Sequence, residues 1–354
     1  MRLLTSIQTL RAVAAIAVVF VHAGYDAARY SGNAWLEEAG NLGQAGVDVF
    51  FVISGFIMFL TACRSPTASP VTFVADRICR IVPLYWLVTL ALLGLAMAGR
   101  SIEHPSPQDL AKSMAFLPVF NAKGEVSPFL PVGWTLVYEM FFYALLAVAL
   151  AARPRHVALL TTALVLLAAG GTAWPGDVAS WWTVYTSPIL LEFVAGLWIG
   201  WAWDKGWRLP APAGAVLAAM GLGLIVLLYG HSFRNEGWLR LLAWGVPAVC
   251  LVLGTLALEG QTFVATRLGL LLGAASYSIY LIHPLVLIVL GRVWLVSGLA
   301  SAFVIFVGST LASIVAGVAC HLLLEKPLVR WSKMALGISS ARSRKAGLAP
   351  DAPR

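Results

Sequence analysis

The sequence predicts an all-α membrane protein with about ten transmembrane helices and both termini in the cytoplasm. Of the 354 residues, 60% are hydrophobic and only 11% are charged, and the mean hydropathy is +0.85. A typical soluble domain has about 25% charged residues. Apolar stretches close to the spanning length of about 20 residues recur along the whole chain. Because backbone groups in lipid must be hydrogen-bonded within their own segment, we expect these stretches to be helices.

Ten apolar stretches fit spanning helices. They cover residues 7–24, 44–62, 82–98, 133–152, 156–173, 185–203, 213–230, 239–257, 270–291 and 296–324. The longest connections, 63–81 and 99–132, are too short to fold alone. We therefore expect one membrane domain over 1–332, followed by a basic tail over 333–354 with the composition of a disordered segment.

The distribution of Lys and Arg predicts the orientation, since cytoplasmic segments carry more of these residues. With the N-terminus inside, the 24 Lys and Arg divide into 17 on the cytoplasmic side and 7 on the outside. Seven of the 17 follow the last span, so the tail decides much of the prediction. The same bias explains the net charge of +8, so membrane lipids are expected partners and nucleic acid is not.

The first span, IQTLRAVAAIAVVFVHAG, carries Arg11 and His22 on one helical face, about 16 Å apart along the axis. Ionisable side chains at such depth are costly in lipid and usually face a polar cavity. A signal peptide cleaved after Ala23 is the alternative, and it would remove His22. Arg11 argues against it, because it interrupts the segment that should be purely apolar.

Further polar residues lie within or beside the later spans. They are Asp48 in GVDVFFVISGF; Arg77 and Arg80 in DRICRIVPLYW; Thr135, Glu139 and Tyr143, with Phe142, on one face of GWTLVYEMFFY; Glu192; Ser276, Tyr280 and His283 in ASYSIYLIHPL; and His321 one turn before Glu325 in HLLLEKPL. We expect His321 and Glu325 to pair with one another. The four cysteines lie far apart without metal-ligand spacing, so free thiols and no metal site are expected.

Most of these residues also have a purely structural interpretation. His22 can be an interfacial histidine, and Asp48 can cap or salt-bridge a helix end. Arg77 and Arg80 lie where topology-setting charges belong. Glu139 is harder to explain in this way, since an acid inside an apolar helix needs a partner.

The motifs resemble those of the acyltransferase-3 family of integral-membrane acyltransferases, especially the bacterial exopolysaccharide O-acetyltransferases. The matching blocks, in family order, are IQTLRAVAAIAVVFVHA, GQAGVDVFFVISGF, FVADRICRIVPLYW, GWTLVYEMFFY, EFVAGLWIG, ASYSIYLIHPL and LEKPL. They extend from about residue 6 to 331, and the first four together are highly specific. Thr135 stands where serine is more common, and the sequence lacks the hydrolase-like domain that some members carry.

The resemblance implies a multi-pass enzyme of the bacterial inner membrane that transfers an acyl group from cytoplasmic acyl-CoA, usually acetyl-CoA, to a sugar hydroxyl, without a further cofactor. By position, His22 matches the family's first-helix histidine and Arg11 its accompanying arginine. Arg77 and Arg80 match an Arg-x-x-Arg pair linked to donor binding. Catalytic acidic positions fall on Asp48 and Glu139, and we expect Tyr143, Tyr280 and His283 to contribute to substrate binding.

This assignment is chemically workable. Guanidinium groups bind the phosphates of CoA by charge-assisted hydrogen bonds. The neutral imidazole of His22 can take the proton of an alcohol that attacks a thioester, and Asp48 or Glu139 could orient the ring. Direct transfer and a relay through an acyl-histidine both remain open.

A transporter of a glycan or lipid-linked intermediate is the alternative function. The same buried polar residues would fit it, but the two halves show no matching helices broken by Gly or Pro. A structural or scaffolding role gives no reason for so many ionisable residues in lipid.

Overall fold

The computed structural model describes residues 4–32, 35–64, 69–99, 104–152, 155–177, 179–228, 237–261, 266–298 and 301–338. Within these ranges the protein is helical, and the only β-pairing is an isolated bridge between Phe120 and Val126. The predicted all-α class is confirmed. The part of the predicted tail from 339 to 354 lies outside the described residues, and its first residues, to Ala335, belong to the last helix.

Nine segments of the described chain are long and apolar enough to span a membrane. They are α1 (Thr5–Ser31), α3 with η1 (Ala45–Met58, Phe59–Cys63), α4 (Pro70–Met97), η2 with α6 (Pro131–Gly133, Trp134–Leu150), α7 (His156–Ala173), α8 with α9 (Trp181–Tyr185, Leu190–Asp204), α11, η3 and α12 (Gly237–Arg240, Leu241–Gly245, Val246–Ala257), α14 (Ser276–Ser297), and α15, η4 and α16 (Ala302–Cys320, His321–Glu325, Lys326–Ala335). A shorter apolar helix, α10 (Ala211–Leu227), corresponds to the seventh predicted span, 213–230. The remaining short helices are α2 (Trp35–Asn41), α5 (Pro107–Met114) and α13 (Arg267–Ala274). The protein is therefore a multi-pass membrane protein.

Two predicted boundaries are wrong. The third span was expected to begin at residue 82, but α4 begins at Pro70 and carries Arg77 and Arg80 inside the helix. Hydropathy assigns such charges to a loop, whereas here they face a cavity. The ninth span was expected over 270–291, but it consists of α13 and α14, which are separated at Ala275.

Close helix contacts at glycine fix the position of α3. A Cβ atom on Gly55 would lie 2.1 Å from the carbonyl oxygen of Phe193 in α9, and one on Gly46 would lie 2.6 Å from that of Ala14 in α1. Small residues let membrane helices approach this closely, because lipid supplies no hydrophobic drive between helices. Helix α3 is thereby held between α1 and α9, which directs its polar residues toward the neighbouring helices.

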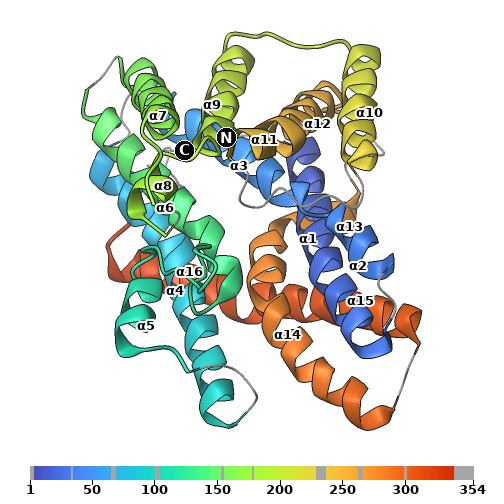
Figure 1. Ribbon diagram of the computed structural model, residues 1–354. Helices are drawn as coiled ribbons and strands as arrows, with labels where there is room; N and C mark the ends of the chain where they lie inside the picture. Colours follow the sequence, from blue (N-terminus) through green and yellow to red (C-terminus); the bar gives the residue numbers. More distant parts are fainter. Residues whose placement is uncertain are drawn as a thin grey trace, which may run out of the picture.

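The remaining packing brings distant segments together (Figure 1). Helix α1 packs against α3, α14 and α15, while α4 packs against α6, α14 and α16. Successive spans must cross in opposite directions. We call the side on which α1 begins the N-terminal face; α3 ends there and α4 begins there. Helix α6 begins at the opposite face, where α7 ends.

Candidate functional site

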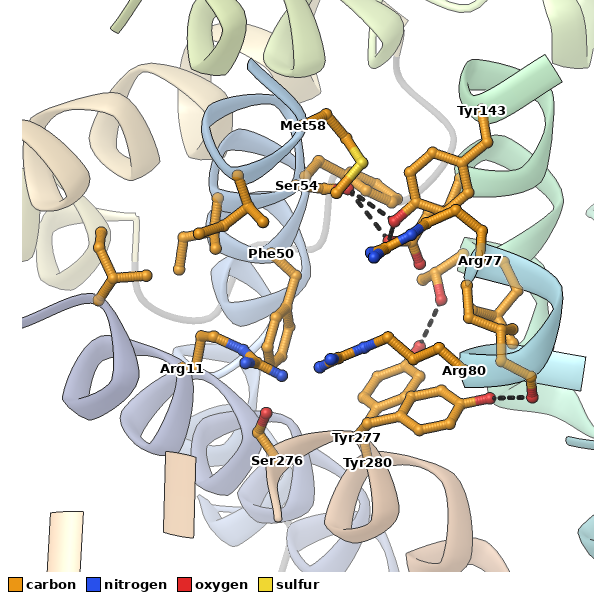
Figure 2. Close-up of a pocket in the computed structure, with 18 of the residues that line it drawn as sticks. Arg11, Phe50, Ser54, Met58, Arg77, Arg80, Tyr143, Ser276, Tyr277 and Tyr280 are labelled. Carbon is orange, nitrogen blue, oxygen red and sulfur yellow. Dashed lines mark hydrogen bonds between the residues drawn. The ribbon is translucent and has the colours of Figure 1, made fainter. Parts of the chain in front are cut away.

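A cavity of about 320 Å³ lies among α1, α3, α4, α6 and α14, toward the N-terminal face (Figure 2). Its polar lining includes three arginines, one carboxylate and several hydroxyl groups. These residues are Gln8, Arg11, Ser54, Thr61, Arg77, Arg80, Thr135, Glu139, Tyr143, Ser276, Tyr277 and Tyr280. Six of the nine sequence-predicted site residues therefore line one cavity, although they come from four helices.

The three arginines give the cavity an excess of positive charge. The Arg77 guanidinium is paired with Asp76, which also binds Lys333 of α16. Arg11 donates to the Gln8 side-chain oxygen at 3.0 Å, and Arg80 makes no hydrogen bond or ion pair with any residue in the described ranges. Figure 2 shows the Arg11 and Arg80 guanidinium groups pointing toward one another across the cavity. Two like charges in a low-dielectric site favour binding of an anion between them.

Glu139 is the carboxylate of this cavity. Its Oε1 accepts a hydrogen bond from Ser54 Oγ at 3.1 Å and another from the Tyr143 hydroxyl. The predicted shared face of Glu139 and Tyr143 is confirmed, whereas Phe142, predicted beside them, does not line the cavity. Phe142 is fully buried and stacks on Phe193, with ring centroids 4.5 Å apart. Ser54 was not predicted, and its position within an apolar run was the signal that could have found it.

His22 lies against His283, with Nδ1 of His22 3.3 Å from Nε2 of His283. In each ring Nδ1 also faces a backbone carbonyl, that of Val18 at 3.0 Å and that of Ile279 at 3.3 Å. Carbonyl oxygens only accept, so we assign Nδ1–H to both neutral rings. This assignment makes His283 Nε2 an acceptor for His22 and places the basic lone pair of His22 on Nε2.

The histidine pair lies next to the cavity, beyond Tyr280. The Tyr280 ring lines the cavity and lies 6.1 Å from the His283 ring, centroid to centroid. Its hydroxyl donates to the Val132 carbonyl at 2.8 Å and contacts the Thr135 hydroxyl at 2.9 Å. Tyr280 therefore forms the part of the cavity wall that adjoins the histidines. Helix α14 continues through Pro284, so His283 does not lie at a helix break.

Asp48 belongs to a different buried cluster. Its Oδ2 accepts a hydrogen bond from Arg240 at 2.8 Å, and Glu192 is buried close to this ion pair. The Arg240 guanidinium carbon lies 5.3 Å and 4.8 Å from the ring centroids of Trp134 and Trp244. The structure thus places Asp48 with Arg240, and Glu139 with Ser54 and Tyr143, rather than either carboxylate with His22. Arg240 lies at the beginning of the eighth predicted span, 239–257, and was not among the predicted site residues. Its closeness to Asp48, 192 positions away, has no sequence signal.

His321 and Glu325 form the predicted pair, with Nδ1 of His321 2.7 Å from Oε2 of Glu325. Ser278 Oγ donates to the same oxygen at 2.6 Å. This prediction is confirmed, and the bond from Ser278 shows its structural use, since it fixes α14 to η4. The four cysteines, all within the described ranges, are buried and form no disulfide. Within the described ranges, no group of three or more His, Cys, Asp or Glu could hold a metal ion.

Comparison with known proteins gives one family and several relatives. A family model, Acyl_transf_3, described as an acyltransferase domain, matches residues 4–322. The exopolysaccharide production protein ExoZ of Rhizobium meliloti is 40% identical over 87% of this chain and 94% of its own length. The putative membrane-bound transacylase BcsY of Komagataeibacter xylinus is 28% identical over 78% and 71%, respectively.

A third similar protein, the acyltransferase MdmB of Streptomyces mycarofaciens, is 26% identical over 92% of both chains. No solved structure matches the chain.

Proposed function

The chain belongs to the acyltransferase-3 family, as its motifs predicted, and we propose that it transfers an acyl group, normally acetyl, from cytoplasmic acyl-CoA to a hydroxyl of an exported or cell-envelope glycan. It is an acyltransferase of the membrane-embedded type. Membership of this family leaves the transporter alternative without a specific observation in its favour.

The assignment of acyl-CoA as the donor is based on the positively charged cavity. CoA has several phosphate groups, and Arg11 and Arg80 offer two guanidinium groups that face one another there. Arg77, oriented by Asp76, supplies a third. Forked, charge-assisted hydrogen bonds from arginine suit phosphate oxygens, and the apolar remainder of the cavity suits the pantetheine arm. The Lys and Arg distribution supports a cytoplasmic N-terminal face, where CoA is available.

We assign the general base to His22. Its Nε2 would accept the proton of the acceptor hydroxyl as that oxygen attacks the thioester carbonyl. The C–S bond then breaks, and the thiolate of CoA takes the proton from the imidazolium. His283 Nε2, by accepting from His22 Nδ1–H, holds the ring in the tautomer that leaves Nε2 basic.

The relay through an acyl-histidine uses the same geometry. In that variant His22 Nε2 itself attacks the thioester carbonyl, the C–S bond breaks, and CoA leaves as the thiolate, which gives an acyl-imidazolium that keeps Nδ1–H. The acceptor oxygen then attacks the acyl carbon, the bond to Nε2 breaks, and the proton of the acceptor hydroxyl passes to the thiolate. Both routes need the Nδ1–H tautomer, so both depend on His283.

The relatives support a glycan acceptor. ExoZ is named as an exopolysaccharide production protein, and its similarity covers nearly the whole chain. We therefore propose exopolysaccharide as the acceptor and the bacterial inner membrane as the location.

The proposed function is tested with inside-out membrane vesicles that contain the protein and are given acetyl-CoA labelled in the acetyl group. We expect label in polysaccharide, releasable by mild base, with wild type and at least tenfold less with Arg80→Ala. Arg64→Ala is the matched control, since Arg64 follows η1 outside the cavity and pairs with Asp204 at 2.9 Å. Label in polysaccharide that does not depend on the protein would contradict the function.

A further inference from the structure

A second cavity of about 280 Å³ lies at the opposite face of the protein. It is formed by the loop before η2, the end of α7, helix α8, and the beginnings of α9 and α11. A hydrogen bond of 2.7 Å from Trp238 Nε1 to Thr172 Oγ1 joins the beginning of α11 to the end of α7 at its edge. The proposed mechanism uses none of these residues.

The lining of the second cavity combines aromatic rings with hydroxyl groups. Four aromatic side chains and four hydroxyl side chains contribute: Phe120, Trp134, Tyr138 and Trp238, with Thr172, Thr183, Thr186 and Ser187. Aromatic faces pack against the C–H faces of sugar rings, and hydroxyl groups exchange hydrogen bonds with the edges of the same rings. A few convergent polar groups on an otherwise apolar lining are typical of a binding site for a small organic ligand.

In contrast to the first cavity, the second has no excess of positive charge among its described lining residues. Arg240 lines it, but its guanidinium is paired with Asp48 at 2.8 Å. The Glu125 carboxylate accepts a hydrogen bond from the Asn121 side chain at 2.9 Å. Among the described lining residues these are the two charged groups, one of each sign. The cavity therefore favours a neutral, hydroxyl-rich ligand, while the first favours an anion.

The two cavities share α6 as a wall. Trp134 and Tyr138, four residues apart, line the second cavity, and Thr135 and Glu139, each the next residue along, line the first. The Trp134 ring is fixed by the Arg240 guanidinium 5.3 Å above it. A ligand in the second cavity thus lies on the far side of one helix from the proposed donor, at the face from which an exported glycan would approach.

We propose that the second cavity binds a neutral sugar residue of the acceptor glycan, with Trp238 as its outer aromatic surface. This inference relies on the proposed function to identify the bound sugar as part of the acceptor. Its binding step does not require turnover, so it can be measured independently.

The test measures equilibrium binding of tritiated oligosaccharides of four to eight sugars, prepared from the polysaccharide of a strain that lacks the gene, to protein in nanodiscs. We expect Trp238→Ala to weaken binding about tenfold, a loss of about 1.4 kcal/mol. Trp238→Phe keeps a ring and should stay within about twofold of wild type. Acetyl-CoA affinity should be unchanged in both.

Trp198→Ala is the matched control. Trp198 is 42% exposed and Trp238 is 43% exposed, and each donates its indole N–H to a threonine of α7. Trp198 lies outside the second cavity, so a loss of binding equal to that of Trp238→Ala would indicate general damage and overturn the proposal. Equal binding by wild type and Trp238→Ala, or no binding by wild type, would also overturn it. Binding that is lost in Trp238→Ala, without any acetyl transfer by wild type, would retain the sugar site but refute the proposed function.

Discussion

The imidazole rings of His22 and His283 lie beside one another, with their centroids 4.8 Å apart and their planes tilted by 53°, although 261 positions separate them in the sequence. His22 comes from the first span and His283 from α14, and each has its Nδ1 on the carbonyl of the residue four positions before it. The pairing fixes which nitrogen of His22 carries the lone pair. In this arrangement an imidazole takes the orienting place that a carboxylate has in hydrolase triads.

His283→Phe should lower kcat about tenfold to a hundredfold, because His22 loses the acceptor that fixes its tautomer. KM for acetyl-CoA should change by less than about twofold, since His283 lies outside the donor cavity. Steady-state kinetics with acetyl-CoA and isolated polysaccharide measure both quantities. His156→Phe is the control, since His156 is also buried and contacts a backbone carbonyl, that of Cys63. Equal loss of kcat in both variants would exclude the orienting role.

Arg80→Ala should weaken acetyl-CoA binding at least tenfold, because a charge-assisted contact to phosphate is worth about 1.5–3 kcal/mol. His22→Ala and Arg64→Ala should bind within about twofold of wild type. Isothermal titration of each purified variant gives the dissociation constants. The donor site would lie elsewhere if Arg80→Ala and wild type bound equally.

Arg240→Met should destabilise the protein by about 3–5 kcal/mol, because Asp48 would be left buried with an uncompensated charge. Adding Asp48→Asn should recover most of this loss, since the unpaired carboxylate of Asp48 is then replaced by a neutral amide. Unfolding followed by tryptophan fluorescence in detergent reports the change. A double variant no more stable than Arg240→Met would mean that the ion pair is not the cause.

Glu259 supports the beginning of α1 from the loop after α12. Its oxygens accept hydrogen bonds from the backbone N–H groups of Thr5 and Ser6, at 3.1 Å and 2.8 Å. Partial burial alone would raise the pKa of Glu259, but these hydrogen bonds outweigh it and lower the pKa below its usual value. The resulting stabilisation is present above the unfolded-state pKa and disappears as the pH falls through the folded-state pKa.

Glu259→Ala should therefore cost about 1 kcal/mol at pH 7, as expected for the loss of a helix cap. The difference from wild type should shrink once the pH is below the folded-state pKa, because wild type then also lacks the carboxylate. Thermal unfolding of both proteins at pH 7 and pH 3 measures the effect. A difference that stays constant between these pH values would argue against the charged cap.

The sequence predicted the spans well, because hydropathy and length alone decide whether a segment crosses lipid. It failed at the beginning of α4, where Arg77 and Arg80 are helical but face a cavity instead of water. The predicted residues Arg11, Glu139, Tyr143 and Tyr280 line that cavity too, but their convergence depends on helix packing, which local patterns do not specify.

The expectation that a carboxylate orients His22 is the prediction that the structure contradicts most clearly. Asp48 and Glu139 were the candidates because triad chemistry favours a carboxylate. In the structure Asp48 is paired with Arg240, and His283 lies against His22. Both pairings join segments far apart in the chain, so only the tertiary structure identifies them.

The most direct test of the account is NMR measurement of base-labile acyl esters on the host's polysaccharides. A strain without the gene would carry either wild type or His22→Ala at equal membrane abundance. Esters that return with wild type and stay absent with His22→Ala would agree with acyl transfer through His22. Esters restored equally by both proteins would contradict the role of His22, and esters unaffected by loss of the gene would contradict the proposed acceptor.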